Sequence, residues 1–488
     1  MFQSKRRNLP IQFREFLTVV AASILACGCA NFGGIAPKSV RADPASLAAA
    51  RSLADAKLSP ADWPTAAWWQ RFGDPQLDAL IAEALAGSPG ISSARARIDK
   101  ASAVAAGYGA ALAPQSTAGA DITRQHFSAS GIYPPPLANS WRTQTQLAAS
   151  VGYEIDLWGR NRAAYDAALG QVRAAEVDAY TVRLLLASSI ARAYAQLGRS
   201  FGQLELAQAM LAQREAIFDL VRQRVAAGLD SQVELKQAEV SIPAARLRIA
   251  QSEEDIALGR NLLAALVGRG PDRGLTIARP HMQRNLPVLP SAFPSDLLGR
   301  RPDLVAQRWR VEAARRDIDA AKGQFYPSIN LGALIGVQSI TFSKLLTSGS
   351  DIPTFGPALR LPLFDGGRLR GNLAAKDADY DLVVEQYNQT LIDAMREVVD
   401  QLTSLRSVDA QRTQLDSALA NAEQAYALAT ERYRAGIGSY LQVLAAETPL
   451  LEQKILLTNL RAHEIDLSIN LIRALGGGFE DTRAAGAP

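Results

Sequence analysis

Alternating apolar and polar residues in four short segments predict β-strands. The segments are residues 116–126, 143–155, 328–338 and 354–363. The third shows the pattern most clearly, with one face made of Ile329, Leu331, Ala333, Ile335 and Val337. Successive strand residues point to opposite sides, so this period of two is typical of a strand with one apolar face. A tilted strand of roughly ten residues is long enough to cross a bilayer.

Long helical segments follow each pair of predicted strands. Residues 162–227 and 369–435 contain no proline and are rich in alanine, leucine, glutamine, arginine and glutamate, which favour helices. At 1.5 Å per residue, each segment would form a rod of about 100 Å. A glycine after each long segment, and a serine three residues later, predict a tight turn into a second helix. We therefore predict two long helical hairpins, at 162–267 and 369–475.

The two groups of elements repeat one unit. Gly159 recurs as Gly367 and Gly228 recurs as Gly436, both at a distance of 208 residues. The predicted fold class is mainly α with a small β part, built from a duplicated helix-strand-strand-helix-helix unit. The boundaries that we predict are residues 88–290 for the first copy, 291–478 for the second copy and 479–488 for a flexible tail.

Four strands cannot close a membrane-spanning barrel, whose smallest bacterial form has about 8 strands. The open edges of the predicted sheet must therefore pair with other copies of the chain. Three copies would supply 12 strands, and the same symmetry would gather the helical hairpins into a tube. Two copies would supply 8 strands without a pore, an arrangement that the sequence alone leaves open.

Aromatic residues gather at the ends of the predicted strands. At the tips of the strand pairs they are Phe127, Tyr133, Trp141, Phe342 and Phe355. At the base of the strands they are Tyr153, Trp158, Phe325, Tyr326 and Phe364. Aromatic girdles mark the two membrane interfaces of outer-membrane barrels. We predict that these side chains form such girdles.

The N-terminus has the features of a bacterial lipoprotein signal. Basic residues precede an apolar run of about 11 residues, which is too short to span a bilayer. Small residues then surround the only two cysteines of the chain, Cys27 and Cys29. We predict a signal peptide over residues 1–28 and acylation of Cys29, which anchors segment 29–87 to outer-membrane lipid; Cys27 is the alternative site. A general secretory signal cleaved at Ala26 would also fit these residues.

Composition and missing motifs argue against several other classes of protein. The net charge is +4 over 488 residues, with both signs interspersed, which gives no electrostatic support for nucleic-acid binding. The three histidines lie far apart without the spacing of metal ligands, and no cysteine follows position 29. The sequence has no phosphate-binding loop, nucleophile elbow or zinc-binding helix motif. We expect no enzyme activity, no cofactor and no metal site.

Five motifs follow one another along the chain. They are Trp68-Trp69-x-x-Phe72-x-Asp74-Pro75, Arg301-Pro302-Asp303-Leu304, Phe325-Tyr326-Pro327-Ser328-Ile329, Phe364-Asp365-Gly366-Gly367-Arg368 and Arg432-Tyr433-x-x-Gly436. In this order they resemble the TolC-like outer-membrane factors, specifically the lipoprotein branch that serves resistance-nodulation-division transporters. The resemblance implies a homotrimer with a 12-stranded outer-membrane barrel on a long α-helical barrel in the periplasm. It also implies that drugs or other small solutes pass outward, with a periplasmic adaptor protein and an inner-membrane transporter as partners.

The resemblance places the functional sites at the tips of the helical hairpins, where the duct opens and meets its pump. The tip residues are Gly228, Leu229, Asp230, Ser231, Gly436, Ile437, Gly438 and Ser439. In relatives, a tyrosine at the position of Tyr433 helps to latch the closed entrance, and Glu234 matches the latch carboxylate of the neighbouring hairpin. Apolar residues such as Leu441 and Leu444 are alternative gate residues.

The chain departs from the family pattern near this predicted gate. Gln442 and Ala445 occupy positions that often carry a ring of aspartates, so the cation preference of such a ring does not carry over. Gly438 likewise replaces an arginine that some relatives have.

Two other functions fit part of the sequence. An exit duct for secreted polypeptides belongs to the same family, but the lipoprotein signal and the paired Trp68 and Trp69 argue against it. A periplasmic coiled-coil adaptor or scaffold would explain the helical hairpins but not the amphipathic strands with aromatic ends. An efflux duct of the bacterial outer membrane accounts for all of these segments.

Overall fold

A computed structural model describes residues 32–47, 58–59, 63–283, 289–290 and 297–481. The predicted signal peptide and both cysteines lie outside these residues. The described chain forms two compact units, which are taken separately below. Unit 1 contains residues 32–41, 98–174 and 307–387, and unit 2 contains the other described residues. Each unit takes segments from both predicted copies, because the long helix of each copy runs from one unit into the other.

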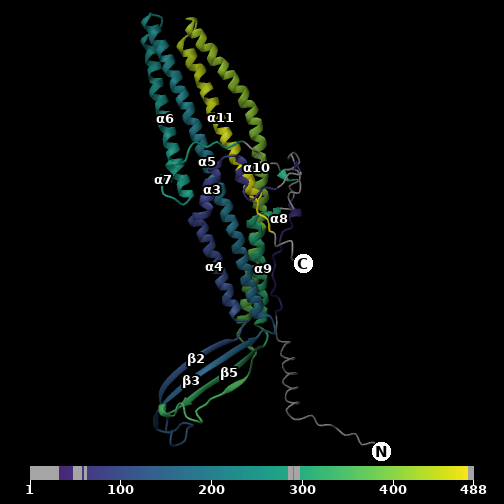
Figure 1. Cartoon of the computed structure of the whole chain (residues 1–488). Helices are drawn as coiled ribbons and strands as arrows, with labels where there is room; N and C mark the ends of the chain where they lie inside the picture. Colours follow the sequence, from purple (N-terminus) through teal and green to yellow (C-terminus); the bar gives the residue numbers. More distant parts are fainter. Residues whose placement is uncertain (1–31, 48–57, 60–62, 284–288, 291–296, 482–488) are drawn as a thin grey trace, which may run out of the picture. The chain divides into compact units, whose positions relative to one another are not determined.

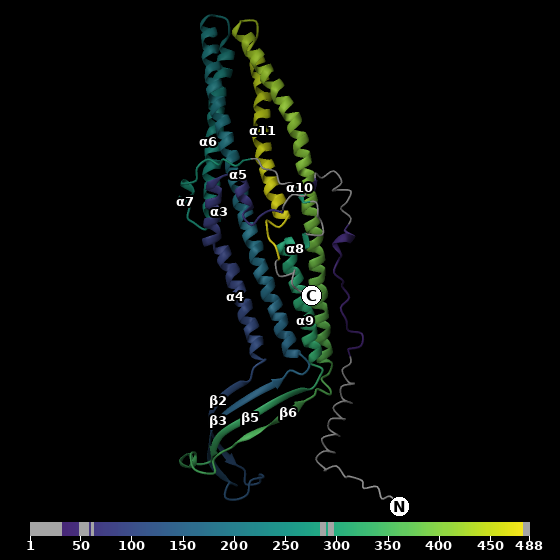
Figure 2. The same ribbon diagram turned by 45° about the vertical axis from the view of Figure 1, so that its right-hand side comes forward.

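Unit 1 contains a four-stranded antiparallel sheet (Figure 2). Its strands, in hydrogen-bonding order, are β2 (Gln115–Phe127), β3 (Ser140–Ile155), β5 (Ser328–Ser339) and β6 (Thr354–Arg360). The two strand pairs join through β3 and β5, so β2 and β6 are the edges of the sheet. Strand β6 ends three residues before its predicted end, because Pro362 has no N–H to extend the ladder.

Helices make up most of the remaining structure (Figure 1). The long elements are α3 (Pro75–Gly87), α4 (Pro89–Ala110), α5 (Arg160–Ala226), α6 (Gln232–Leu266), α9 (Pro302–Gly323), α10 (Arg368–Arg434) and α11 (Tyr440–Ala474). The short elements are η2 (Pro44–Ser46), β1 (Leu58–Ser59), η3 (Trp68–Phe72), α7 (Asp272–Leu275), β4 (Leu289–Pro290), α8 (Leu297–Arg300) and η4 (Phe342–Lys344). Helices α5 and α10 have 67 residues each, and α6 and α11 have 35 each. Within the described ranges, no helix combines the length and hydropathy needed to cross a membrane.

A carboxylate caps each long helix where the chain leaves the sheet. Asp156 accepts a hydrogen bond from the backbone N of Arg162 at 2.7 Å, before α5. Asp365 accepts one from the backbone N of Leu369 at 2.9 Å, before α10. These bonds satisfy N–H groups that have no partner inside the helix. The Phe364-to-Arg368 motif therefore has a local structural role.

The helices of unit 1 approach one another closely at glycines. A Cβ added at Gly170 of α5 would lie 2.9 Å from the Cβ of Ala313 in α9. One added at Gly323, the last residue of α9, would lie 2.8 Å from the Cβ of Arg160. Glycine at these two positions thus permits the helices to pack closely side by side.

The described N-terminal segment lies along α10 in unit 1. The backbone N–H groups of Lys38 and Ser39 donate to one oxygen of Asp381, each at 2.8 Å. Phe32 packs edge-on against Phe325, with ring centroids 4.9 Å apart. These contacts hold residues 32–39 against the helices that adjoin the sheet.

The paired-tryptophan motif builds the main core of unit 2. Trp68 and Phe72 are buried in one cluster with side chains from α3, α5, α6 and α11. Asp74 caps α3 through the backbone N of Gln76 at 3.0 Å and accepts from the Tyr194 hydroxyl at 2.8 Å. A residue that begins α3 is thereby tied to the middle of α5.

The Arg301-Pro302-Asp303-Leu304 motif joins three helices in unit 2. The Arg301 side chain is 9% exposed and donates to Asp303, to Glu397 of α10 and to the carbonyl of Ala474 in α11. Its Nη1 lies 3.0 Å from the Glu397 carboxylate and 3.1 Å from the Ala474 oxygen. This motif anchors the start of α9 to the second hairpin.

The described part of the predicted flexible tail is packed against unit 2. The Phe479 ring lies 5.2 Å from the ring of Tyr180, between centroids. The backbone N of Asp481 donates to the carbonyl of Gly299 at 3.3 Å. Residues 479–481, at the start of the predicted tail, thus contact the rest of unit 2, and the flexibility of the tail stays a prediction. Residues 482–488 lie outside the described chain.

Candidate functional site at the hairpin tips

The two helical hairpins end in the same backbone turn, which we call tip 1 (residues 227–231) and tip 2 (residues 435–439). In tip 1 the backbone N of Gly228 donates to Val225 at 3.0 Å, and that of Leu229 donates to Arg224 at 2.9 Å. The equivalent bonds in tip 2 join Gly436 to Tyr433 and Ile437 to Arg432. The two glycines have φ of 71° and 77°, in the left-handed region. Both turns are Schellman motifs, which end a helix and favour glycine at this position.

The return helices begin with capping boxes. At tip 1 the Glu234 carboxylate accepts from the backbone N of Ser231 at 2.9 Å, and the Ser231 hydroxyl accepts from Val233 N at 3.1 Å. At tip 2 the Gln442 side-chain oxygen accepts from the backbone N of Ser439 at 3.3 Å. Both predicted gate residues, Glu234 and Gln442, thus act in local caps within the chain.

Arg224, near the end of α5, connects the two tips. Its Nε lies 2.9 Å from one oxygen of Asp230, and its Nη2 lies 3.3 Å from the other. Its Nη1 donates to the carbonyl of Tyr433 at 3.0 Å, and its guanidinium lies 4.5 Å from the centre of the Tyr433 ring. The Tyr433 hydroxyl donates in turn to Asp230. We call these three residues the tip cluster.

The tip cluster is largely closed to water. Tyr433 is fully buried, and the side chains of Arg224 and Asp230 are 12% and 11% exposed. The hydrogen bond from Arg224 holds the pKa of the Asp230 carboxyl below its usual range, and the Tyr433 hydroxyl adds to this effect. Burial raises the pKa of the Tyr433 phenol, and donation to Asp230 raises it further. The cluster is therefore an ion pair with a neutral phenol at neutral pH.

Within one chain the Tyr433 hydroxyl contacts Asp230, and the predicted latch between Tyr433 and Glu234 of the neighbouring hairpin stays a prediction. Within the chain its hydroxyl donates to Asp230, one of the predicted tip residues, and Glu234 is engaged in the cap of α6. Leu441 is 67% exposed, and Leu444 packs partly buried beside Tyr433. The contact with Asp230 depends on how the two hairpins pack side by side, which periodicity does not specify.

Sequence reasoning missed Arg224, although the sequence contains a signal for it. Arg224 and Arg432 each stand four residues before a tip glycine, at the 208-residue spacing of the repeats. Both arginines supply a carbonyl to the turn, and the side chain of Arg224 also forms an ion pair with Asp230.

Each tip also exposes one large apolar side chain. Leu229 is 65% exposed and Ile437 is 70% exposed. Each stands one residue after the tip glycine, at a position that usually packs against its own helix. Their exposure in both tips leaves these side chains available to a partner.

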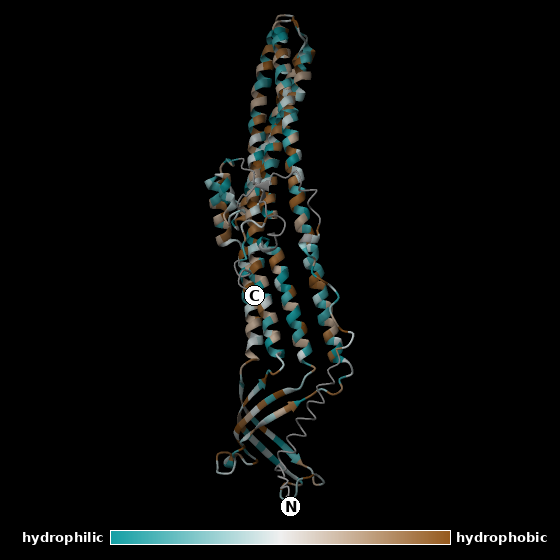
Figure 3. Cartoon of the chain, turned by 90° about the vertical axis from the view of Figure 1, so that its right-hand side faces the viewer, coloured by the Kyte–Doolittle hydropathy of each residue, from teal (hydrophilic) through white to brown (hydrophobic). Residues whose placement is uncertain are grey.

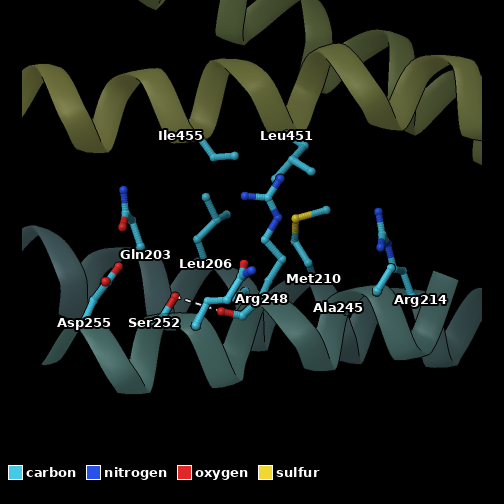
Figure 4. Close-up of a pocket in the computed structure, with 13 residues that line it drawn as sticks. Gln203, Leu206, Met210, Arg214, Ala245, Arg248, Ser252, Asp255, Leu451 and Ile455 are labelled. Carbon is cyan, nitrogen blue, oxygen red and sulfur yellow. Dashed lines mark hydrogen bonds between the residues drawn. The ribbon is translucent and has the colours of Figure 1, made fainter. Parts of the chain in front are cut away.

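A pocket of about 310 Å³ lies between α5, α6 and α11 of unit 2 (Figure 4). Leu206 and Leu451 face it from opposite helices. Beside it, Nε of Arg214 lies 3.1 Å from the Glu447 carboxylate, and Nη1 donates to the carbonyl of Ser241 at 3.0 Å. This ion pair links the two hairpins away from the tips.

The sheet of unit 1 has two chemically distinct faces, which its register defines. Along the strand ribbons, hydrophobic and hydrophilic residues alternate (Figure 3). We call apolar the face formed by even-numbered residues of β2 and odd-numbered residues of β3, β5 and β6. All the large apolar side chains that are exposed in these four strands lie on it. They are Ile122, Trp141, Leu147, Val151, Leu331, Ile335, Phe355 and Leu359, with exposures from 43% to 87%. So extensive an exposed apolar surface marks contact with a membrane or a partner.

The opposite face, which we call polar, carries four of the five charged residues of these strands. They are Asp121, Arg142, Glu154 and Arg360, and the fifth, Arg124, lies over Trp141 on the apolar face. The polar face also has the Thr117–Ser150 hydrogen bond at 2.8 Å. Its larger apolar members, Phe127 and Leu334, are not exposed.

The predicted aromatic girdle residues divide into exposed and packed side chains. Tyr133, Trp141, Trp158, Phe342, Phe355 and Phe364 are exposed. Trp158 stacks on Tyr326 with centroids 4.7 Å apart and donates to the carbonyl of Pro327 at 2.8 Å. Phe127 is buried against Tyr133, and Phe325 packs in the cluster around Phe32. Tyr153 is partly buried on the apolar face.

No three histidine, cysteine, aspartate or glutamate side chains come together to hold a metal ion in the part of the chain that the structure describes. The predicted lipidation sites Cys29 and Cys27 lie outside that part. The candidate functional features of the described chain are the apolar face of the sheet in unit 1 and the tip cluster in unit 2.

Comparison with known proteins agrees with this architecture. Residues 80–269 and 293–477 match the family described as outer membrane efflux protein. The fusaric acid resistance protein FusA of Burkholderia cepacia is 41% identical over 368 residues, which are 74% of this chain and 69% of that protein. The multidrug resistance outer membrane protein MdtP of Escherichia coli K12 is 33% identical over 441 residues, 87% of this chain and 89% of that protein.

A solved structure is also similar. The crystal structure of the outer membrane protein VceC from Vibrio cholerae matches with a TM-score of 0.80 and 40% identity, covering 86% of this chain and 100% of that one. The sheet and the long hairpins are thus those of an outer-membrane channel. The chain belongs to the outer membrane efflux protein family. It is the exit duct of an efflux pump, in a family of channels rather than of enzymes.

Proposed function

We propose that three copies of this chain close a 12-stranded barrel in the bacterial outer membrane, above a periplasmic barrel made of the helical hairpins. The observation that carries this proposal is the sorting of every exposed large apolar side chain in the strands onto one face of the sheet. Edge strands β2 and β6 can pair between copies, which removes the exposed edges. In the closed barrel, the apolar face of the sheet would contact lipid and the polar face would line the lumen.

The closed barrel would conduct drugs or other small solutes passively, without a catalytic step. The names of FusA and MdtP, a fusaric acid resistance protein and a multidrug resistance protein, support small organic molecules as cargo. Its partners would be a periplasmic adaptor protein and an inner-membrane resistance-nodulation-division transporter. The exposed Leu229 and Ile437 at the tips are suited to contact such a partner.

The tip cluster would hold the resting entrance narrow. Arg224 and Asp230 of the first hairpin bind Tyr433 of the second, so the tips separate only if these bonds break. Each bond is worth about 1 kcal/mol net, or somewhat more where a charge takes part. Glu234, Leu441 and Leu444 would add contacts between neighbouring copies.

Acylation at Cys29 would anchor the N-terminus to outer-membrane lipid. The contacts of Lys38 and Ser39 with Asp381 support a chain that runs from this anchor along α10. The aromatic girdle of the barrel would use the exposed Trp141, Phe355 and Phe364.

Channel recording and mass measurement test this function together. We expect the purified protein to be a trimer in detergent and to form conducting channels in a planar bilayer. A stable monomer or dimer that gives no conductance would refute the proposed assembly.

The lipid anchor has its own test, in which the intact mass of Cys29→Ser should lack the acyl groups. Loss of acylation in Cys27→Ser with retention in Cys29→Ser would move the site to Cys27.

A further inference from the structure

One row of polar residues crosses three strands of the polar face. Asp121 of β2 pairs with Gln146 of β3, and Gln146 pairs with Gln338 of β5. Residues paired in this way have side chains on the same face, about 5 Å apart between Cβ atoms. A carboxylate and two amides therefore form one continuous band across three strands.

Asp121 stands at the centre of its strand. It is the seventh of the 13 residues of β2, so about 20 Å of strand lies on each side of it. Its side chain is exposed, and it has no hydrogen-bond or ion-pair partner among the residues that the structure describes. A carboxylate group without a local counter-charge acts on charged solutes in the space that it faces.

The other charged residues of the polar face lie nearer its ends. Glu154 is paired with Arg160, whose Nη2 lies 2.7 Å from both carboxylate oxygens. Arg142 is four residues along β3 from Gln146, a separation of about 13 Å. Arg360 is the last residue of β6, at the opposite end of the sheet. These separations exceed the Debye length of about 8 Å at physiological salt, so Asp121 is the dominant charge of the polar face at this row.

We propose that Asp121, in its row with Gln146 and Gln338, gives the membrane part of the duct a preference for cationic solutes. This inference rests on the proposed trimeric barrel, which would bring three copies of the row to one level of the lumen. Rings of carboxylates are a known means of cation selection in channels. Low-dielectric walls strengthen their field, and the amides of Gln146 and Gln338 can bind the same solutes without adding charge.

The test is the reversal potential of single channels in a potassium chloride gradient. We expect the ratio of cation to anion permeability to fall by roughly two- to fivefold in Asp121→Asn, from the loss of three screened carboxylates. The substitution keeps the shape of a side chain that has no partner, so the channel should still assemble.

Asp351→Asn is the matched control. Asp351 is also exposed, but it pairs in an isolated antiparallel bridge with Val337, a residue of the apolar face next to Gln338. Its substitution removes the same charge and should leave the permeability ratio unchanged. An equal fall in both variants would show that only net charge matters and would overturn the proposal.

A second measurement tests where the side chain points. Asp121→Cys should react with a water-soluble, positively charged methanethiosulfonate reagent, and the modified channel should favour anions. Ile122→Cys, one residue away on the apolar face, should stay unmodified in the bilayer. The chain has no cysteine after position 29 that would add a signal.

The possible failures of the two proposals are distinguishable. A wild-type protein without conductance would refute the proposed barrel itself. Conducting channels whose permeability ratio is the same in the wild type and in Asp121→Asn would refute the role of Asp121 alone. Modification of Ile122→Cys instead of Asp121→Cys would show that the two faces are assigned the wrong way round.

Discussion

The two hairpin tips have the same backbone conformation but different side-chain interactions. Both turns are Schellman motifs with a left-handed glycine, and both have an arginine four residues before it. At tip 1, Arg224 pairs with Asp230; at tip 2 the residue 208 positions after Asp230 is Gly438, and Arg432 is exposed. Tyr433 of the second hairpin reaches across to Asp230 instead. The repeated turn gives both tips the same backbone shape, and the residues that differ between the tips connect the two hairpins.

Tip 2 has little free space beside Gly438. A Cβ added at Gly438 would lie 3.1 Å from the backbone N of Tyr433 and 3.2 Å from the carbonyl carbon of Arg432. A side chain would press on the end of α10, where Tyr433 is held. The single carboxylate of tip 1 thus serves both hairpins.

The largest effect should come from breaking both turns. Gly228→Trp with Gly436→Trp forces a Cβ into the left-handed region at both tips, at about 1 kcal/mol or more each, and places a bulky ring on the partner surface. We expect loss of efflux, measured as drug susceptibility, with the trimer unchanged in detergent.

The control for this double variant is Gly270→Trp, at an exposed glycine away from the tips with nothing within 4 Å of an added Cβ. It should keep efflux. Normal efflux in the double tip variant would mean that the tips do not bind the pump.

The next largest effect should distinguish Arg224 from Arg432, the equivalent arginine before tip 2. Arg224→Ala leaves Asp230 nearly buried without its cation and should destabilise the tips by about 2–3 kcal/mol. Arg432→Ala changes an exposed side chain and should cost less than about 0.5 kcal/mol. Hydrogen exchange of the tip amides measures both, and equal protection in the two variants would contradict the asymmetry.

A smaller effect should come from removing the Tyr433 hydroxyl. Tyr433→Phe removes one hydrogen bond, about 1 kcal/mol for each copy and some three times that in a trimer, so resting single-channel conductance should rise. Glu234→Gln should be nearly neutral, because Gln442 already fills the same cap position in tip 2. The opposite result, with conductance raised only by Glu234→Gln, would place the latch between neighbouring copies.

The smallest effect should be that of mild acid. The pKa of Asp230 is lowered in the folded tip, so its stabilisation is fully present above the ordinary carboxyl pKa of about 4 and is lost as the pH falls through the lower folded value. Conductance and tip protection should therefore be the same at pH 7 and pH 5. Opening between these values would point to a different titrating group.

Local physics explains which elements could be predicted. Strand alternation, proline-free helices and a glycine followed by a serine depend on neighbouring residues, and the predicted hairpins follow from them. Strand β6 ends at Arg360 although the alternation of residues continues to 363, because Pro362 breaks the ladder. The ring contact between Phe479 and Tyr180 joins residues about 300 positions apart, which local patterns do not predict.

The sequence by itself determined the two hairpins, the glycine turns and the period-two strands, because each depends on residues only a few positions apart. Only the tertiary structure decided that β3 pairs with β5, that Arg301 binds Glu397 and that Tyr433 meets Asp230. Those partners are 96 and 203 residues apart in the two side-chain pairs. Their pairing depends on the packing of whole helices, which brings distant side chains within hydrogen-bond distance and which no local pattern encodes.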